Sequence, residues 1–214
     1  MSEPVKRRYD SSRRQDQARR TRARVVEAAT SLFVERGYAA TSIASIAEAA
    51  EVAPQTIYAT FGTKAAVLGA AIDVALAGDD EPVPVYDRAD AQAAMAADTP
   101  KAAAEAFARQ VTALMERAGH LLAAADAAAQ SDPELTPLWV GGHRGRHEDM
   151  KRVACSLADR GLLREGFTAK SAADLLWVLA SPEAYRSFTV IRGWTSKQYE
   201  PWLVDAVGNG LLRP

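Results

Sequence analysis

Apolar residues recur at helical spacing along most of this 214-residue chain, and no alternating run is long enough to indicate a strand. Between residues 18 and 36 one apolar stripe is evident, made of Val25 or Val26, Ala29, Leu32 and Phe33. Gly37 follows at a position where glycine commonly ends a helix. Residues 1–17 are charged and have no periodicity, which predicts a disordered arm. Either its arginines contact DNA, or they are solvated and only aid the solubility of the protein.

Two shorter helical patterns follow between residues 41 and 64. In the first, Ile43 and Ile46 lie on one face, and Thr41 or Ser42 can cap the start by accepting a backbone N–H bond. The pattern fades after residue 49. A tight turn is therefore predicted between the two helices.

The second short pattern begins at Pro54, which suits a first helical turn because its missing N–H needs no partner there. Ile57 and Phe61 are four residues apart and are predicted to face the core, while Tyr58 lies between the two faces. The remaining side chains are small or polar: Gln55, Thr56, Ala59 and Thr60. Such a pair of helices is typical of a helix-turn-helix, whose second helix enters the DNA major groove.

A larger set of residues extends this pattern: Gly37, Tyr38, Thr41, Ser42, Ile43, Ile46, Ala47, Ala50, Val52, Pro54, Thr56, Ile57, Tyr58, Phe61 and Lys64. In this order and spacing the set resembles the tetracycline-repressor-like (TetR) family of transcriptional regulators. Residues 163–167, 176–183 and 192–203 resemble the C-terminal part of one subgroup, so the resemblance covers nearly the whole chain. It implies an all-α, homodimeric DNA-binding regulator.

Three positions depart from the family pattern. Glu51 stands where a turn glycine is usual, and a positive φ there would cost about 1–2 kcal/mol. Ala53 stands where a capping serine is common, and a missing cap costs about 1 kcal/mol. Thr60 replaces an aromatic residue or histidine, which shortens the reach to one phosphate.

The rest of the chain is also predicted to be helical. Residues 78–85 break the periodicity and mark the clearest boundary. Helices are predicted at 64–77, 87–97, 100–118, 121–130, 134–163, 168–180, 182–192 and 196–212. Gly141, Gly142 and Gly145 predict a bend or break in the longest one, because each interior glycine costs about 1 kcal/mol relative to alanine.

We therefore expect a disordered basic arm over residues 1–17, a three-helix helix-turn-helix DNA-binding domain over 18–63, and a larger helical ligand-binding and dimerisation domain over 64–214. The high alanine content favours closely packed helices. Residues 1–64 carry eleven lysines and arginines against seven aspartates and glutamates, although the whole chain has a net charge of −1. This asymmetry predicts a nucleic-acid face at one end of the protein.

The cellular compartment is predicted from the absence of membrane-spanning, secretion and disulfide signals in the sequence. No apolar run approaches the roughly 18 residues needed to span a bilayer, and the N-terminus has no signal-peptide pattern. The single cysteine, Cys155, is better interpreted as a buried small residue than as a nucleophile, and it has no partner for an internal disulfide. A cytoplasmic protein without membrane contact is expected.

The predicted recognition helix, residues 54–61, carries suitable side chains for DNA. Gln55 can pair with adenine, and Thr56 can contact a base edge or a thymine methyl. With the positions implied by the family pattern, the predicted DNA-binding residues are Thr41, Ser42, Pro54, Gln55, Thr56, Tyr58, Thr60 and Lys64. For Tyr58, a half-buried core position is the alternative.

The resemblance also implies a ligand cavity and a dimer interface. The predicted cavity lining is Phe107, Leu114, Met115, Leu122, Trp139, Met150 and Trp177, for each of which ordinary core packing is the alternative. An apolar lining suits a hydrophobic or aromatic effector. The predicted interface, on helices 182–192 and 196–212, comprises Tyr185, Phe188, Tyr199, Trp202 and Leu203, since these helices are too apolar for exposure.

Enzymatic signals are weak. His143 and His147 lie four residues apart and could begin a metal site, but no third ligand is identifiable, so a solvated or pocket-lining pair is the alternative. No phosphate-binding glycine loop or serine-nucleophile motif is present. We expect no catalytic activity, no cofactor and no metal.

The sequence thus predicts a homodimeric repressor that a small apolar or aromatic effector releases from a near-palindromic double-stranded DNA operator. Two other hypotheses remain. One is a ligand- or partner-binding protein on the same scaffold without operator binding, which the three departures would suit. The other is a metal-dependent helical enzyme that uses His143 and His147.

Overall fold

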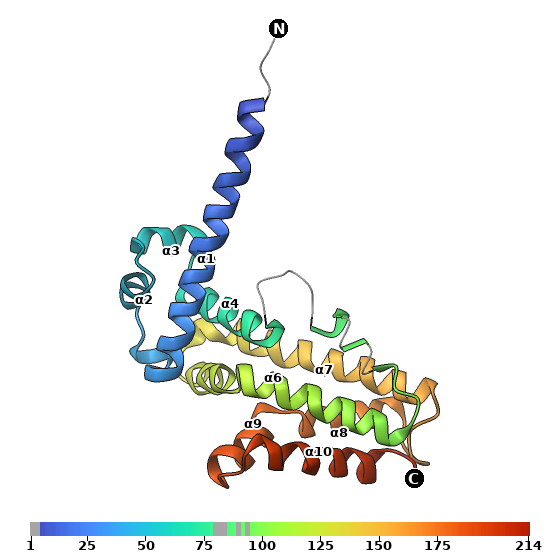
Figure 1. Cartoon of the computed structure of the whole chain (residues 1–214). Coiled ribbons are helices and arrows are strands. Elements are labelled where there is room, and N and C mark those ends of the chain that lie inside the picture. Colours follow the sequence, from blue (N-terminus) through green and yellow to red (C-terminus); the bar gives the residue numbers. More distant parts are fainter. Residues whose placement is uncertain (1–4, 79–84, 89–90, 93–94) are drawn as a thin grey trace. The chain divides into compact units, whose positions relative to one another are not determined.

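The structure is a computed structural model that describes residues 5–78, 85–88, 91–92 and 95–214 (Figure 1). The chain divides into two compact units, Met1–Val74 and Ala75–Pro214, called unit 1 and unit 2 below. Over the described residues both units are helical and contain no strand, and one isolated antiparallel bridge joins Leu163 to Leu212. The predicted all-α fold is confirmed.

Unit 1 contains α1 (Val5–Ala40), α2 (Ile43–Ala49), α3 (Pro54–Phe61) and most of α4 (Lys64–Ala77). The apolar stripe predicted on the first helix forms part of its core, and all its members are buried: Val25, Val26, Ala29, Leu32 and Phe33. The helix α1 packs against α2, and α2 packs against α3.

The prediction of a disordered arm over residues 1–17 is wrong for residues 5–17, which form the first turns of α1. Residues 1–4 lie outside the described residues. The physical reason is that residues 5–17 contain no glycine or proline, and extending an existing helix adds one hydrogen bond per residue without a new nucleation step. Gly37 (φ 76) interrupts the helical backbone where the sequence predicted a helix end.

Local sequence signals set the ends of the short helices. Ser42 is the N-cap of α2, and its side chain and that of Ser45 exchange bonds with each other's backbone N–H. Ala53 precedes α3 without any side-chain cap, as expected from its departure from the family pattern. Gly62 (φ 80) ends α3, and the hydroxyl of Thr63 accepts a bond from the first turn of α4.

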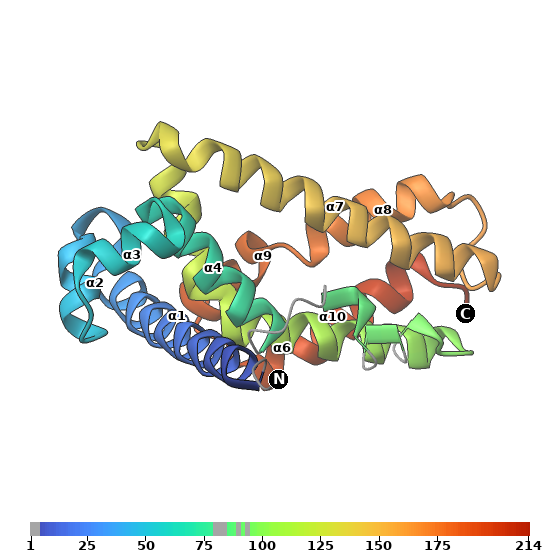
Figure 2. The same ribbon diagram turned by 90° about the horizontal axis from the view of Figure 1, so that it is seen from above.

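Unit 2 contains the end of α4 and a set of further helices. They are η1 (Val85–Asp87), α6 (Pro100–Ala129), η2 (Pro133–Leu135), α7 (Thr136–Asp159), α8 (Ala169–Leu179), α9 (Pro182–Arg186), the π-helical turn η3 (Ser187–Ile191) and α10 (Ser196–Leu211). Figures 1 and 2 show α6 running along α10 and α7 along α8, and these are the most extensive helix pairings. The helix predicted at 87–97 lies partly outside the described residues.

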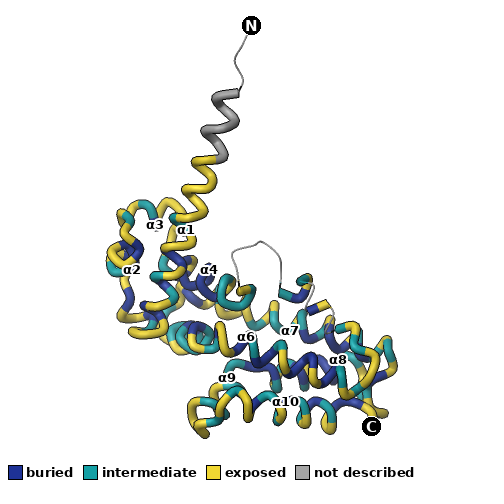
Figure 3. The backbone as a smooth tube through the Cα atoms, viewed as in Figure 1, coloured by how far each residue is buried: buried dark blue, intermediate teal, exposed yellow. Residues whose placement is uncertain are grey.

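The core of unit 2 lies between these paired helices, where Figure 3 shows the buried parts of α6, α7, α8 and α10. Its largest fully buried side chains include Met150 from α7, Leu176 from α8, and Tyr199 and Leu203 from α10. These apolar faces explain why the helical pattern was readable from the sequence.

Two long helices differ from the prediction because packing outweighs their glycines. The helix α6 runs unbroken from Pro100 to Ala129, although separate helices were predicted at 100–118 and 121–130. Ala118 and Leu121 on either side of Gly119 are both buried, which holds the helix together at a cost of about 1 kcal/mol for the glycine.

The predicted bend or break at the glycines of α7 is also wrong. This helix continues through Gly141, Gly142 and Gly145, none of which has a positive φ. Its C-terminal half is anchored by buried residues such as Met150 and Leu157, so three exposed glycines do not interrupt it.

No single helix among the described residues is long and apolar enough to cross a membrane. Within the described ranges, α3 and α4 reach that length and apolar character only when taken together, and this pair is bent by 72°.

Candidate nucleic-acid interface and effector region

The helix α3 buries one face and exposes the other. Ile57 is buried, whereas Gln55, Tyr58 and Thr60 are exposed, with Tyr58 at 55%. The alternative of a half-buried core position for Tyr58 is therefore not what the structure has. Thr60 donates its hydroxyl proton to the Thr56 carbonyl at 2.8 Å, which leaves its oxygen lone pairs for other donors. Polar groups thus line the outer face of the helix predicted to recognise DNA.

The turn before α3 has the strained geometry predicted for Glu51. This residue has φ 51, and it is the C′ residue of a Schellman motif in which Val52 N–H bonds the Ala47 carbonyl at 2.9 Å. Arg24 of α1 contacts the same turn through its guanidinium, which donates to the carbonyls of Ala50 and Glu51, the latter at 3.1 Å. It also pairs with the Glu51 carboxylate at 3.5 Å.

The role of Arg24 at this turn was not predicted from the sequence. Its bonds satisfy carbonyls at the end of α2 and give the Glu51 side chain a cationic partner, so they help to offset the absence of glycine. The signal in the sequence was an acidic residue at a turn position, but its partner lies 27 residues earlier and is not identifiable from spacing.

The structure distinguishes between Thr41 and Ser42. Thr41 is buried, and its hydroxyl donates towards the carbonyls of Leu32 and Gly37, at 3.2 and 2.8 Å. Its side chain is committed to the fold, so a direct phosphate contact by Thr41 is not compatible with this structure. Ser42 is exposed at the start of α2, and only this member of the pair remains a candidate for phosphate binding.

Lys64 joins the start of α4 to the end of α1. Its Nζ donates to the carbonyls of Tyr38 and Thr41, both at 3.0 Å, and lies 3.9 Å from the centre of the Tyr38 ring. Lys64 therefore has a structural role that spacing did not predict. A phosphate contact through the remaining N–H of its ammonium group stays a prediction.

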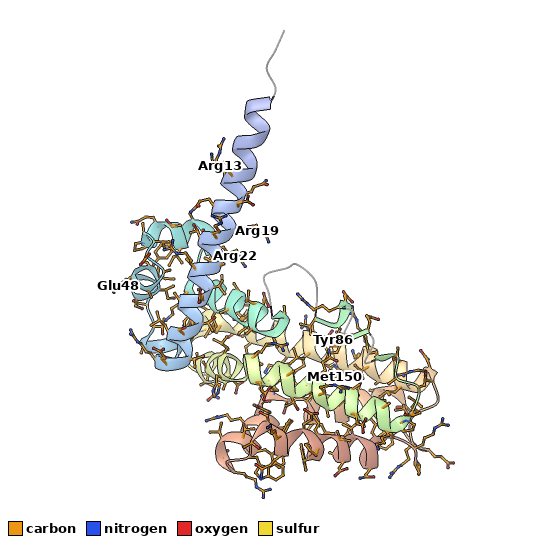
Figure 4. The ribbon with its side chains drawn as sticks, viewed as in Figure 1. Arg13, Arg19, Arg22, Glu48, Tyr86 and Met150 are labelled. Carbon is orange, nitrogen blue, oxygen red and sulfur yellow. The ribbon has the colours of Figure 1, made fainter. Side chains whose placement is uncertain are left out.

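The exposed arginines of α1 supply positive charge to unit 1. Arg13, Arg14, Arg19 and Arg20 are all exposed. Figure 4 shows Arg13, Arg19 and Arg22 at successive levels along this helix. Arg22 lies over the ring of Phe61, 4.9 Å from its centre, and so connects α1 to α3. Unit 1 thus combines a polar helix face with a basic helix, the two features that backbone and base contacts to DNA require.

A family model matches one part of the chain. Residues 25–71 match the model of the bacterial regulatory proteins of the tetR family. The chain therefore carries the N-terminal domain of the tetR family over these residues. No curated protein sequence matches it.

Several solved structures share the fold over almost the whole chain. NalD from Pseudomonas aeruginosa, the secondary repressor of the MexAB-OprM multidrug efflux pump, has 20% identity and a TM-score of 0.68, covering 92% of this chain and 98% of its own. FadR from Bacillus subtilis, in complex with stearoyl-CoA, has 16% identity and a TM-score of 0.69, covering 88% and 98%. SmeT in complex with triclosan has 22% identity and a TM-score of 0.64, covering 90% and 92%.

The residues predicted to line an effector cavity fall into two groups. Phe107, Met115 and Met150 belong to the hydrophobic core of unit 2, Leu122 and Trp177 pack against that core, and Leu114 is also buried. Trp139 differs: it is 41% exposed, and its indole N–H donates to the Asp126 carboxylate at 2.6 Å. The apolar cavity lining stays a prediction for the six other residues.

An open pocket of about 430 Å³ lies between α7 and α8. It is lined by His147, Lys151, Cys155, Ala169, Lys170, Ala173 and Asp174. Of these, only His147 was considered from the sequence as a pocket-lining residue. The prediction that Cys155 is buried is wrong, because Val153, Ala154 and Leu157 occupy the core face of α7 and position 155 points outward.

Two ionisable side chains of unit 2, those of Tyr86 and Arg146, are largely buried. Tyr86 comes from η1 and is labelled in Figure 4 together with Met150 of α7. Burial, aided by the negative charge of Asp149, raises the pKa of the Tyr86 phenol well above its usual range. Burial lowers the pKa of Arg146, whose guanidinium donates to the Trp177 carbonyl and lies 4.7 Å from the centre of the Trp177 ring.

The side chains predicted to form the dimer contact are only partly accessible. Tyr199 and Leu203 are fully buried in the core of their own chain, so neither can contact a second subunit in this structure. Tyr185, Phe188 and Trp202 are half-buried and pack against the same core. Sequence periodicity shows that a position is apolar but does not show whether its partner belongs to the same chain or to another.

Proposed function

We propose that this protein is a TetR-type regulator, which binds double-stranded operator DNA through α3 and acts as a homodimeric repressor. The observation that carries the proposal is the exposed polar face of α3, where Gln55 and Tyr58 point away from a core closed by Ile57. Gln55 is the residue proposed to contact a base edge, most favourably adenine. Ser42, Tyr58 and Thr60 are proposed to contact phosphates, which position the helix in the groove.

A small apolar or aromatic effector is proposed to release the repressor from DNA. The support is the large apolar core of unit 2, together with the stearoyl-CoA and triclosan complexes of the similar regulators FadR and SmeT. The effector can shift the regulator only by binding one arrangement of the dimer more tightly than the other.

The helix α4 is the proposed link, since it begins in unit 1 and ends in unit 2. Its last turn is held by Arg117 of α6, which donates to the carbonyls of Ala75 and Leu76 at 3.1 and 3.0 Å. A displacement of α6 by an effector would therefore act directly on the end of α4.

The proposed dimer surface is the exposed apolar part of α8 and η3. Val178, Val190 and Ile191 are 55%, 57% and 75% exposed, respectively. Exposed apolar groups of this kind are typical of an interface between copies. A two-fold dimer would present two α3 helices to a near-palindromic operator, as symmetric regulators do. The cytoplasm is the proposed location, because operator DNA lies there.

A ligand- or partner-binding protein without operator binding is the second candidate. One observation favours it: Thr41 and Lys64 are both engaged in bonds within unit 1, which reduces the number of groups available to phosphates.

The two candidates can be separated by fluorescence anisotropy with DNA from around the protein's own gene, titrated at several salt concentrations. The proposed function predicts tight binding to one sequence, and Gln55→Ala should cost about 1–3 kcal/mol on that sequence and little on others. Gln130→Ala, at an exposed glutamine of unit 2, is the matched control and should bind as the wild type does. Weak binding that is equal on all sequences and lost with modest salt would support the second candidate.

A further inference from the structure

Three potential metal ligands from three helices meet in unit 2. They are Asp126 of α6, His143 of α7 and Glu183 of α9. One ligand atom from each lies within 4.8 Å of the others, and His143 Nε2 is 4.0 Å from Asp126 Oδ1. The residues are separated by up to 57 positions in the chain, so only the fold brings them together.

The neighbouring side chains orient this cluster. The indole N–H of Trp139 donates to Asp126 Oδ1 at 2.6 Å, which fixes the carboxylate. The rings of Trp139 and Trp177 lie 4.4 and 6.2 Å from the His143 ring, both edge to face. His143 and Asp126 are half-buried, with side-chain exposures of 27% and 39%. This arrangement resembles the outer shell that holds metal ligands in place.

The second histidine of the predicted pair has a separate partner. His147 Nε2 lies 3.1 Å from Asp174 Oδ1, on the side of α7 that faces α8. The sequence hypothesis of a metal site that uses both histidines is therefore not supported by the geometry. His143 with two carboxylates from other helices is a different ligand set, and neither carboxylate was identified from the sequence.

We propose that Asp126, His143 and Glu183 form a site for a divalent transition-metal ion of the zinc class. One imidazole nitrogen and two carboxylate oxygens are ligands that zinc accepts, and a water would complete four-coordination. The two carboxylates balance the charge of the ion, which in turn removes their mutual repulsion. Tetrahedral bonds of about 2.1 Å require ligand atoms about 3.4 Å apart, so the cluster must contract by about 1 Å.

Glu183 can provide most of this contraction. It is exposed and lies in the first turn of the short helix α9, whereas Asp126 and His143 are held by their neighbours. Arg146 interacts electrostatically with Glu183 and opposes a cation at the site. Its guanidinium is largely committed to the Trp177 carbonyl and ring, which limits that competition.

The test is a titration of Zn²⁺ and Co²⁺ into tag-free full-length protein that has been treated with a chelator. Binding is followed by tryptophan fluorescence, because Trp139 and Trp177 adjoin the cluster, and by the visible absorption of bound Co²⁺. We expect one ion per chain. His143→Ala, Asp126→Asn and Glu183→Gln should each weaken binding at least about tenfold, and circular dichroism should show that each variant is folded.

Matched variants separate this site from its surroundings. Asp126→Asn keeps an oxygen that can accept the Trp139 bond, so its loss of metal would report the carboxylate rather than a disturbed fold. His147→Ala and Cys155→Ser alter the neighbouring pocket and should bind metal as the wild type does. The proposal is overturned if the wild-type protein takes up no stoichiometric metal, or if His147→Ala abolishes binding while His143→Ala retains it.

Discussion

Glu51 occupies a backbone conformation that L-residues other than glycine seldom adopt. Its φ of 51 completes the Schellman motif at the end of α2, and the Arg24 guanidinium compensates by bonding the carbonyls of the same turn. The strain and its compensation are both local. This makes the position suitable for a direct test of the cost of the missing glycine.

Glu51→Gly is expected to raise the free energy of unfolding by up to about 1 kcal/mol. The glycine removes the strain, and the exposed Glu51–Arg24 ion pair that it removes contributes little. The measurement is urea denaturation followed by circular dichroism. The control, Glu48→Gly, places glycine at an exposed helical position of α2 and should lower stability by about 1 kcal/mol. Equal losses in the two variants would contradict the account.

At the scale of single residues, the sequence predicted the local conformation of a position better than it predicted which distant residues contact each other. The positive φ considered for Glu51 and the missing cap at Ala53 follow from residue type and spacing, and both are observed. The partners of Arg24 and Lys64 are 23 to 27 residues away, and only the folded structure brings them together. The convergence of Asp126, His143 and Glu183 could not be predicted for the same reason.

At the scale of elements, the helix α7 shows how packing overrides a local signal. Gly141, Gly142 and Gly145 predicted an interruption, but the continuous helix has enough buried contacts in its C-terminal half to hold them. Similarly, α6 passes through Gly119 and α1 extends to Val5. Helix existence was readable from the 3.6-residue period, whereas helix continuity depended on contacts that the period does not contain.

Replacing the glycines of α7 by alanine should stabilise the protein. No atom lies within 4 Å of a Cβ at Gly142 or Gly145, and neither has a positive φ, so each substitution is expected to add about 0.5–1 kcal/mol. Thermal denaturation measures the change. Gly161→Ala is the control: it also meets open space, but its φ of +63 should make alanine destabilising. If all three substitutions stabilise the protein, the gain at Gly142 and Gly145 cannot be attributed to the helical backbone of α7.

At the scale of the whole molecule, a near-palindromic operator requires two copies of the chain. Because Tyr199 and Leu203 are buried within one chain, the contact must use side chains that remain outside, and the exposed apolar residues of α8 and η3 are the candidates. The apolar character of the C-terminal helices was correctly predicted. Which of their faces meets a second copy could not be, because intrachain and interchain burial produce the same pattern.

Ile191→Asp and Val178→Asp should each shift the protein from dimer to monomer, since a carboxylate in an apolar interface is left without a partner. Sedimentation equilibrium over a range of concentrations measures the change. Val140→Asp, at an apolar position of α7 that is 39% exposed, is the control and should remain dimeric. A wild-type protein that sediments as a single chain at all concentrations would contradict the proposed dimer.

The central claim is that α3 reads a specific DNA sequence, and selection from a random double-stranded DNA pool with the full-length protein tests it most directly. The account predicts that repeated rounds enrich an inverted repeat with half-sites about one helical turn apart, and that Gln55→Ala loses the base preference at one position of each half-site. A pool that remains without a common sequence after repeated selection, although the protein is folded and dimeric, would contradict the account.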